Sequence, residues 1–416
     1  MTPNENKYRW ALLVILLVAL AARVFAIAYA GASLHFPDSA DYDTLARAIL
    51  HGQPYHVDAG FAIRMPGYPI LIAGIYTVCG AHPPAVLFVQ ALLGAASAAM
   101  TYVLAQRISP LVGVLAAAFV ALDPLNVGFS AALLSEVPFT LAMLIALEVA
   151  LRLAEPLSAA PWWHWPLLGV VLAIAIYLRA SAFGLAALLF LITMFLARRT
   201  TWRTITGGLI AFILVFTILL PWWLRNESIF GPASAPFTRL TTLEGLSLYE
   251  AVYADADGGP RQDVILRTMS PADRLQWSAL GESARDLTWR RLAWDEIRTH
   301  PARIARLALI KIGRTWSPTF NTAEFSQPWL QAVMLLWHIP IYLLAVIALL
   351  RRRVPLRLLI LLAAPILYFT AVHALFLGSV RYRVPLMPLV EIVAAAGALG
   401  LWDAARKSQR RAAIRV

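Results

Sequence analysis

The sequence contains few charged residues and almost no cysteine. Only 14% of its 416 residues are Asp, Glu, Lys or Arg and 60% are apolar, whereas a typical soluble domain is about 25% charged and 45–50% apolar. A soluble globular protein is therefore excluded. The single cysteine, Cys79, excludes an intrachain disulfide and a cysteine-based zinc cluster.

The sequence also lacks the short motifs of several enzyme classes. Its eight histidines show no H-E-x-x-H spacing, which makes a zinc site an unfavoured hypothesis. It has no P-loop, no dinucleotide-binding glycine pattern and no G-x-S-x-G nucleophile elbow. We therefore expect no metal and no cofactor. The net charge is +12. In a membrane protein such a charge reflects which loops hold the basic residues, so we do not expect nucleic acid as a partner.

Long apolar runs are what the sequence has in abundance. Each crossing of the hydrocarbon needs about 20 mostly apolar residues. Ten runs are candidates, near 10–30, 85–105, 111–133, 136–154, 165–178, 182–197, 204–224, 329–350, 356–377 and 384–402. The run 66–80 is short and opens with two prolines, which suits an interfacial or re-entrant segment better than a span. The prediction is an all-α polytopic membrane protein with about ten transmembrane helices.

The distribution of Lys and Arg predicts how these helices are oriented. If 66–80 does not cross, sixteen basic residues fall on the side of both termini, and only five fall in the short loops opposite. Because cytoplasmic loops collect Lys and Arg, we expect both termini in the cytoplasm. The first run is too long for a signal-peptide core and has no obvious cleavage site. We therefore expect it to be a retained signal anchor.

Three parts are predicted along the chain. Residues 1–224 form a membrane module, which includes a first outer loop at 31–84 with a short amphipathic helix. Residues 225–328 form a long outer loop with interfacial helices. Residues 329–416 hold the last spans and a basic cytoplasmic tail.

Acidic residues at the predicted outer face are the first candidates for chemistry, because an ionisable group beside the hydrocarbon is costly unless it is paired or hydrated. Asp38, Asp41 and Asp43 follow the first span, and Glu136 begins the fourth. A purely structural role, capping the start of a helix and favouring its dipole, is an alternative for each of them. A carboxylate beside an alcohol or amine can also act as a general base.

Arginines from separate segments reach the same predicted face. They are Arg64, Arg179, Arg225, Arg381 and Arg383. For Arg64 the alternative is a side chain that snorkels to lipid phosphate. The planar guanidinium suits phosphate oxygens. Carboxylates and arginines together at a membrane surface fit transfer from a phosphate-linked lipid donor, in which the base deprotonates the acceptor and the cations stabilise the departing phosphate.

The order of five motifs resembles a known family. An acidic first outer loop is followed by R-x-P-G-Y-P at 64–69, S-E-x-x-F at 135–139, P-W-x-x-R-N at 221–226 and R-Y-R-x-P at 381–385. This order is similar to that of the GT-C glycosyltransferases, in the bacterial branch that resembles protein O-mannosyltransferases and lipid A aminoarabinose transferases.

The resemblance implies roles for particular residues. Asp38, with Tyr42 four residues later, corresponds to the catalytic base, Asp41 is the second choice, and Glu136 assists. The remaining members of the site would bind the donor phosphate or the substrate: Arg64, Tyr42, Tyr68, Arg179, Arg225, Asn226, Arg381, Tyr382 and Arg383. Relatives have a basic residue before a Pro-Pro pair, whereas this chain has Arg64-Met65-Pro66-Gly67.

The resemblance also implies a reaction and its partners. A polyprenyl-phosphate sugar would be the donor and substrate, and the acceptor would be a glycan, lipid or protein outside the bacterial inner membrane. Transfer would proceed with inversion and without a metal. Two rival functions stay open: a transporter or flippase for lipid-linked sugars, although no paired halves or midplane polar groups were recognised in the sequence, and a non-enzymatic membrane scaffold.

Overall fold

The computed structural model describes residues 3–31, 36–58, 60–155, 161–197, 202–231, 240–260, 265, 269–321 and 325–414. This part of the chain is nearly all helical, and its only β-type pairing is an isolated bridge between Val57 and Gly60. The predicted all-α membrane fold is confirmed.

Seven described helices are long and apolar enough to cross a membrane. They are α1 (Pro3–Ala30), α4 (Pro83–Ala105), α7 (Glu136–Ala154), α10 (Trp202–Phe230), α16 (Pro328–Leu350), α17 (Leu356–Leu375) and α18 (Met387–Ile414). Each coincides with one of the predicted runs. Helix α10 continues past residue 224, so that Arg225 and Asn226 lie on its last turns rather than in a loop.

Three further predicted spans are shorter helices: α5 (Pro110–Leu122), α8 (His164–Leu178) and α9 (Ala182–Leu196). The predicted run 111–133 is not one helix. It breaks at Asp123, whose carboxylate accepts hydrogen bonds from the backbone N–H groups of Leu125 and Asn126 and so begins α6 (Pro124–Phe129). Proline at the first position of α6 strengthens this new start.

The segment 66–80, predicted not to cross, contains a single 13-residue helix, α3 (Gly67–Cys79). At 1.5 Å per residue, a helix of this length reaches about 20 Å, short of the hydrocarbon thickness of about 30 Å. The amphipathic helix predicted in the first outer loop is α2 (Pro37–Leu50), and it buries Tyr42, Leu45 and Ala46 as its periodicity indicates.

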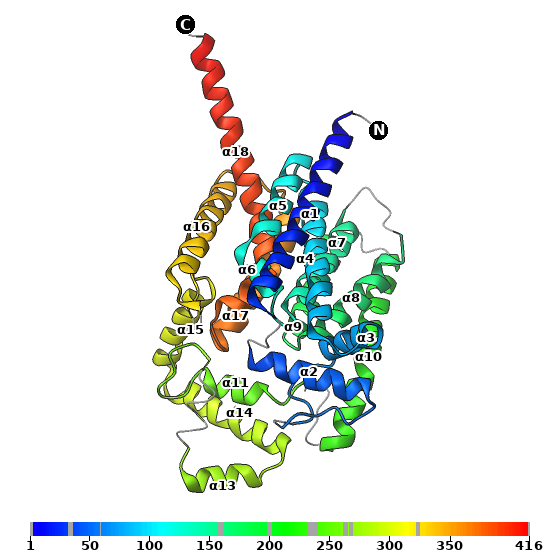
Figure 1. Cartoon of the computed structure of the whole chain (residues 1–416), viewed down its shortest axis with the longest axis vertical. Coiled ribbons are helices and arrows are strands. Elements are labelled where there is room, and N and C mark those ends of the chain that lie inside the picture. The colour runs from blue at the N-terminus through cyan, green and yellow to red at the C-terminus, as the bar shows by residue number, and fades with distance from the viewer. Residues whose placement is uncertain are drawn as a thin grey trace.

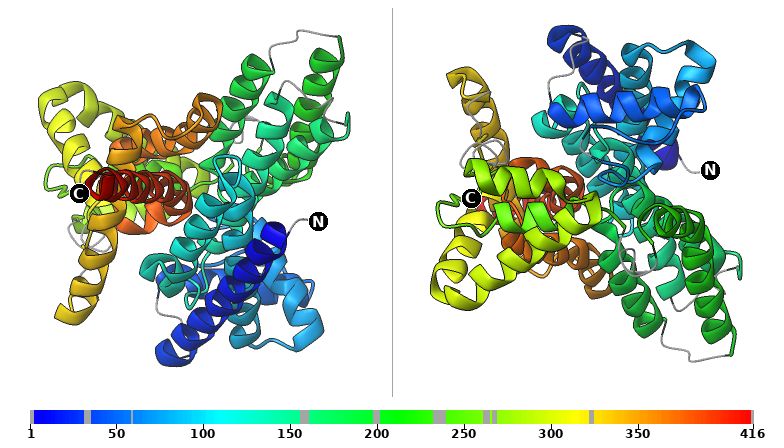
Figure 2. Two further views of the ribbon diagram at one scale, coloured as in Figure 1. Left: turned by 90° about the horizontal axis from the view of Figure 1, so that it is seen from above. Right: turned by 90° about the horizontal axis from the view of Figure 1, so that it is seen from below.

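Both described chain ends lie at one end of the molecule (Figure 1). The opposite end is formed by α2 and by three helices of the long segment: α11 (Glu244–Glu250), α13 (Pro271–Ala279) and α14 (Glu282–Thr299). In the view from below, α2 and the yellow-green helices both face the viewer at this end (Figure 2). Helix α15 (Pro301–Thr315) leads from there to α16.

Helix α7 and the first half of α18 are the most buried parts of the long helices. A helix that is apolar all around belongs inside a bundle, and these two segments follow this pattern. Glu136 is the first residue of α7, and the 3-10 helix η2 (Val380–Leu386) leads directly into α18. The two central helices therefore begin beside each other at the end where α2 lies.

Candidate active site

Asp38 lies in the first turn of α2, after Pro37 at the first helical position. Its carboxylate makes no capping hydrogen bond. Instead, Oδ1 accepts a hydrogen bond from Arg64 Nη2 at 2.5 Å, and Oδ2 accepts one from Arg381 Nη1 at 2.6 Å. The capping alternative therefore does not account for this residue.

The two arginines control the charge of Asp38. Burial on its own would raise the pKa of the Asp38 carboxyl, but the adjacent Arg381 and Arg64 outweigh burial and lower the pKa to about 2. Asp38 is thus ionised at neutral pH and firmly paired. In this state it is a weak base, because a general base works best with a pKa near the operating pH.

Arg64 reaches the site from the stiff loop before α3. Its Nε and Nη2 also donate to Asp41 Oδ2, at 3.2 and 3.0 Å, and its guanidinium lies over the Tyr42 ring. Gly67 allows this placement, since a Cβ there would stand 2.6 Å from the backbone of Tyr177. The glycine of the R-x-P-G-Y-P motif thus lets the loop approach the end of α8.

Glu136 forms the other half of an ion-pair chain. Its Oε1 accepts a hydrogen bond from Arg381 Nε and lies 3.2 Å from Arg179 Nη1, and its side chain is fully buried. Arg381 therefore bridges Asp38 and Glu136 with different nitrogens of one guanidinium. Counting from α2 to α8, carboxylates and arginines alternate: Asp41, Arg64, Asp38, Arg381, Glu136, Arg179. We call these six residues the ion-pair network.

A cavity of about 430 Å³ lies against this network. Its polar wall includes Asp38, Arg64, Arg179 and Arg381, the acid and the three arginines of the network that reach the cavity. Its apolar wall comes from helices of the bundle: Leu178, Phe183, Gly184, Tyr368, Val372 and Phe376. Helix α11 contributes Glu244 and Ser247 on the side away from the chain termini.

Of the remaining predicted site residues, some line the cavity and others lie behind its wall. Tyr42 and Tyr382 line the cavity, whereas Tyr68 is fully buried and packs edge-on against Tyr42, with its hydroxyl donated to Gln90. Arg383, also fully buried, donates to the Ser317 carbonyl and to the Tyr342 hydroxyl. Unlike Arg381, Arg383 is not part of the cavity wall.

Arg225 and Asn226 support the loop that carries Arg64. Arg225 Nη2 donates to the Tyr55 carbonyl at 2.8 Å, and the Tyr55 hydroxyl donates to the Arg64 carbonyl at 3.1 Å. Asn226 accepts a hydrogen bond from Arg225 Nη1. Neither side chain lines the cavity, so their contact with Arg64 is indirect.

Glu282, which the sequence did not indicate, joins the two outer segments. Its carboxylate accepts hydrogen bonds from the backbone N–H groups of Phe61 and Ala62, at 2.6 and 2.9 Å, and from the Thr242 hydroxyl. The Thr242 N–H also donates to the Ala62 carbonyl. These bonds hold the residues before Arg64 against the start of α11. No local pattern marks such a contact, because its partners lie about 220 positions apart.

The described residues contain no group of three or more His, Cys, Asp or Glu side chains placed to hold a metal ion. The carboxylates of the ion-pair network face arginines instead. The absence of a metal and of a cofactor stays a prediction.

Comparisons with known proteins agree with this architecture. Residues 64–224 match the family model described as dolichyl-phosphate-mannose-protein mannosyltransferase. No curated protein sequence matches the chain. The matched region contains Arg64, Glu136 and Arg179, which are three of the six residues of the ion-pair network.

Structures of an archaeal oligosaccharyltransferase show the same fold. The archaeal oligosaccharyltransferase AglB from Archaeoglobus fulgidus, in complex with an inhibitory peptide and a dolichol-phosphate, aligns with a TM-score of 0.58 at 14% identity, over 100% of this chain and 52% of that one. The apo form of the A. fulgidus oligosaccharyltransferase gives a TM-score of 0.58 at 13% identity, over 97% and 52%. ArnT from Cupriavidus metallidurans, bound to undecaprenyl phosphate, gives 0.43 at 15% identity, over 96% and 78%. The chain spans about half the length of the oligosaccharyltransferase.

The fold is that of the archaeal oligosaccharyltransferase, and residues 64–224 match a mannosyltransferase family model. The predicted resemblance to GT-C glycosyltransferases is thereby confirmed.

Proposed function

We propose that this protein is an integral membrane glycosyltransferase that moves a sugar from a polyprenyl-phosphate donor to an acceptor at the outer face of the bacterial inner membrane. The observation that carries the proposal is the cavity beside the ion-pair network, which has three arginines on one wall and apolar side chains from the bundle on the other. A lipid phosphate needs both kinds of wall.

The donor class follows from the two walls. Phe183, Tyr368 and Val372 offer an apolar surface to a prenyl chain, while Arg64 and Arg381 offer donors to phosphate oxygens. The dolichol-phosphate in the AglB complex supports the same class. The lipid-linked sugar is then the substrate, and no cofactor is proposed.

The pairing of Asp38 suggests how the base becomes active. When a phosphate takes up donors of Arg64 and Arg381, Asp38 loses positive partners, and the pKa of its carboxyl rises toward the operating pH. Donor binding would thus prepare the base. Glu136, which also pairs with Arg179, holds the Arg381 guanidinium in place.

The transfer step is a single displacement. The acceptor oxygen or nitrogen attacks the anomeric carbon, the bond from that carbon to the phosphate oxygen breaks, and the phosphate keeps the electron pair. Asp38 takes the proton of the acceptor, and the arginines stabilise the charge that develops on the phosphate. Attack opposite to the leaving group inverts the anomeric centre.

The orientation of the protein is part of the proposal. The positive-inside rule places both termini in the cytoplasm, and the described chain ends and the cavity helices α2 and α11 lie at opposite ends of the molecule. The cavity then faces the periplasm. Labelling of single engineered cysteines near residues 7 and 296 with a membrane-impermeant reagent in intact spheroplasts tests this, and only the second should react.

The decisive experiment is sugar transfer in proteoliposomes supplied with a panel of polyprenyl-phosphate sugars and envelope acceptors. Asp38→Asn should reduce the rate by about 10²–10⁴-fold, the contribution of a general base, and EDTA should leave the wild-type rate unchanged. Asp43→Asn is the matched control, because Asp43 lies on the same helix but pairs with Arg47 and Tyr76 outside the cavity.

Two results would contradict the proposal. Full activity of folded Asp38→Asn protein would remove Asp38 as the base. Donor-dependent movement of labelled lipid across the vesicle, with no new glycosidic bond in any reaction, would instead assign the cavity to a flippase.

A further inference from the structure

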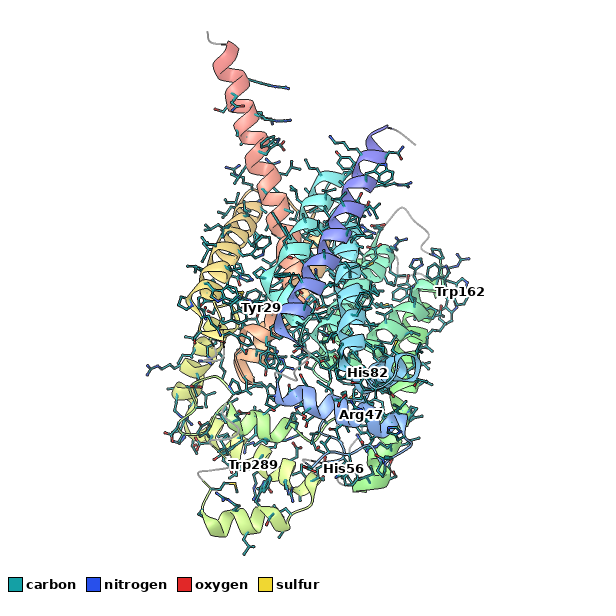
Figure 3. All side chains as sticks on the ribbon, viewed as in Figure 1. Tyr29, Arg47, His56, His82, Trp162 and Trp289 are labelled. Atoms are coloured by element: carbon teal, nitrogen blue, oxygen red, sulfur yellow. The ribbon has the colours of Figure 1, made fainter. Side chains whose placement is uncertain are left out.

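A second cavity, of about 350 Å³, lies in the long outer segment. Its volume falls within the range of about 300–1,000 Å³ usual for ligand pockets. The lining residues are Tyr249, Tyr253, Ile265, Met269, Ser270, Trp277, Leu280, Thr288, Trp289 and Leu292. We call it the aromatic cavity. Trp289, labelled in Figure 3, lies at the end of the molecule away from the chain termini.

The aromatic side chains in the walls of the aromatic cavity pack against one another. The rings of Tyr249 and Trp289 lie 4.8 Å apart, those of Trp277 and Trp289 6.4 Å apart, and the Arg285 guanidinium lies 4.4 Å from the Trp277 ring centre. Aromatic and cation–π contacts of this kind fix ring orientation at little entropic cost. The rings are therefore already in place for a flat ligand.

Two indole donors in these walls have no hydrogen-bond partner among the described residues. They are the Nε1–H groups of Trp277 and Trp289, and the Trp289 side chain is only 5% exposed. A buried donor without a partner costs about 1–3 kcal/mol. Because these two nitrogens are buried, a ligand in the aromatic cavity meets the faces of the rings rather than the N–H groups.

None of the lining residues is charged. A phosphate, an acidic glycan or a basic peptide would thus find no counter-charge among the described residues that line the cavity. The neighbouring helix α14 carries many charged side chains, among them Arg285, Asp286 and Arg290, which places the aromatic cavity in water rather than in hydrocarbon. Aromatic faces without charged neighbours in the lining match a neutral sugar ring, whose C–H faces stack on aromatic rings.

Helix α11 separates the aromatic cavity from the catalytic cavity. Glu244 and Ser247 line the catalytic cavity, and Tyr249, from the same helix, lines the aromatic one. Gly245 anchors the helix, because its N–H donates to Asp286 Oδ1 at 2.6 Å and a Cβ there would meet the Asp286 backbone at 2.0 Å. One side of a short, fixed helix thus faces each cavity.

We propose that the aromatic cavity binds a neutral sugar residue of the acceptor, so that the acceptor is a glycan or a glycan-bearing molecule. This inference rests on the proposed function. The donor enters from the bundle side of the catalytic cavity, and the acceptor is held from the aqueous side, with one of its sugars bound beyond α11.

The test uses the full-length protein in nanodiscs and an array of neutral oligosaccharides, followed by titration of the strongest binder with intrinsic tryptophan fluorescence. Trp277→Ala should weaken binding by about tenfold or more, as truncation of an aromatic anchor does. Trp277→Phe keeps the ring and removes the N–H, so it should show a smaller loss. Trp294→Phe, on α14 but not in the cavity wall, is the matched control.

Asp38→Asn separates this inference from the proposed function. It should bind the oligosaccharide like the wild type while its transfer activity is lost. In transfer assays Trp277→Phe should raise the KM for the acceptor and leave kcat unchanged. If no variant transfers sugar but the fluorescence titrations behave as expected, the proposed function fails and the sugar site stands.

Other outcomes overturn the sugar site. They are the absence of binding to every neutral oligosaccharide, equal binding by Trp277→Ala and the wild type, and preferential binding of apolar peptides or of fatty acids in the same titration. Because Trp277 is half-buried and Trp277→Phe is conservative, a folding defect of the alanine variant leaves the phenylalanine variant to decide.

Discussion

The ion-pair network and the buried polar groups among the spans use charge in different ways. In the network, carboxylates face arginines directly beside a cavity. Among the spans, Arg23 of α1 is also fully buried, but it donates to the backbone carbonyls of Ala19, Val120 and Ala121. It thus supplies donors to the C-terminal end of α5, whose last carbonyls have no partners within the helix.

Asp123 serves a helix start instead. Its carboxylate accepts hydrogen bonds from backbone N–H groups at the start of α6 and lies 3.4 Å from His338. Arg23 and Asp123 thus serve the two helix ends that meet inside the bundle. Neither lines the catalytic or the aromatic cavity. In this protein, the ionisable residues beside the catalytic cavity have side-chain partners that a ligand can replace. Where the partners are helix ends, the residue stabilises the fold.

Among the variants that test this comparison, Arg381→Lys should give the largest effect on activity. Lysine keeps the charge but cannot bridge Asp38 and Glu136 with a planar guanidinium, so kcat should fall by about 10²–10³-fold, as for loss of one transition-state donor. Transfer assays in proteoliposomes measure this. Arg303→Lys is the control, since Arg303 pairs with Glu296 outside the catalytic cavity. Equal loss in both variants would contradict a special role for Arg381.

Arg23→Met should act on the fold. It removes charged donors from three backbone carbonyls. Hydrogen bonds to charged groups contribute about 1.5–3 kcal/mol each, so the free energy of unfolding should fall by about 4.5–9 kcal/mol. Thermal unfolding in detergent measures the loss, against Arg203→Met, which changes an exposed arginine. The folded fraction should keep the wild-type KM for the donor. A changed KM without a loss of stability would contradict a purely structural role for Arg23.

Glu282→Gln should give a smaller effect. Each carboxylate oxygen accepts a separate backbone N–H, from Phe61 and Ala62, and the amide group of glutamine replaces one acceptor by a donor. The loop that carries Arg64 loosens, and the KM for the donor should rise by about tenfold. Glu282→Asp tests for partial rescue. Glu296→Gln, on the same helix and away from the loop, should match the wild type.

The pH profiles of kcat/KM and of kcat should have acid limbs at different pH values. In the free enzyme the pKa of Asp38 is about 2, so kcat/KM should show no acid limb from this group above about pH 4. In the loaded enzyme the phosphate shares the arginines, the pKa rises, and kcat should fall at a higher pH, since protonation removes the base. Coincident acid limbs in the two profiles would contradict an exchange of arginine partners.

The helices were largely predictable because apolar length and charge placement act locally. The spans at α1, α4, α7, α10, α16, α17 and α18 each follow from one continuous run. The break at Asp123 was missed, although the pair Asp123-Pro124 is an N-cap followed by a first-position proline. Apolar residues on both sides outweighed this signal.

The site was only partly predictable. Motif order brought together Asp38, Glu136, Arg64 and Arg381, and the predicted topology added Arg179. Neither could distinguish Arg381 from Arg383, two positions apart. In η2 one of them bridges carboxylates and the other binds a carbonyl and a hydroxyl behind the wall. Glu282 and the aromatic cavity depend on contacts between distant segments, which no local periodicity records.

The bonds of Glu282 and Thr242 to residues 61 and 62 have a consequence for chimeric proteins. Because the first outer loop and the long outer segment close on each other through backbone groups, neither is an independent module for exchange with a relative. A chimera that imports a new acceptor segment in place of 225–328 must also carry the matching stretch around 57–64, or the transplanted part will meet a loop shaped for another partner.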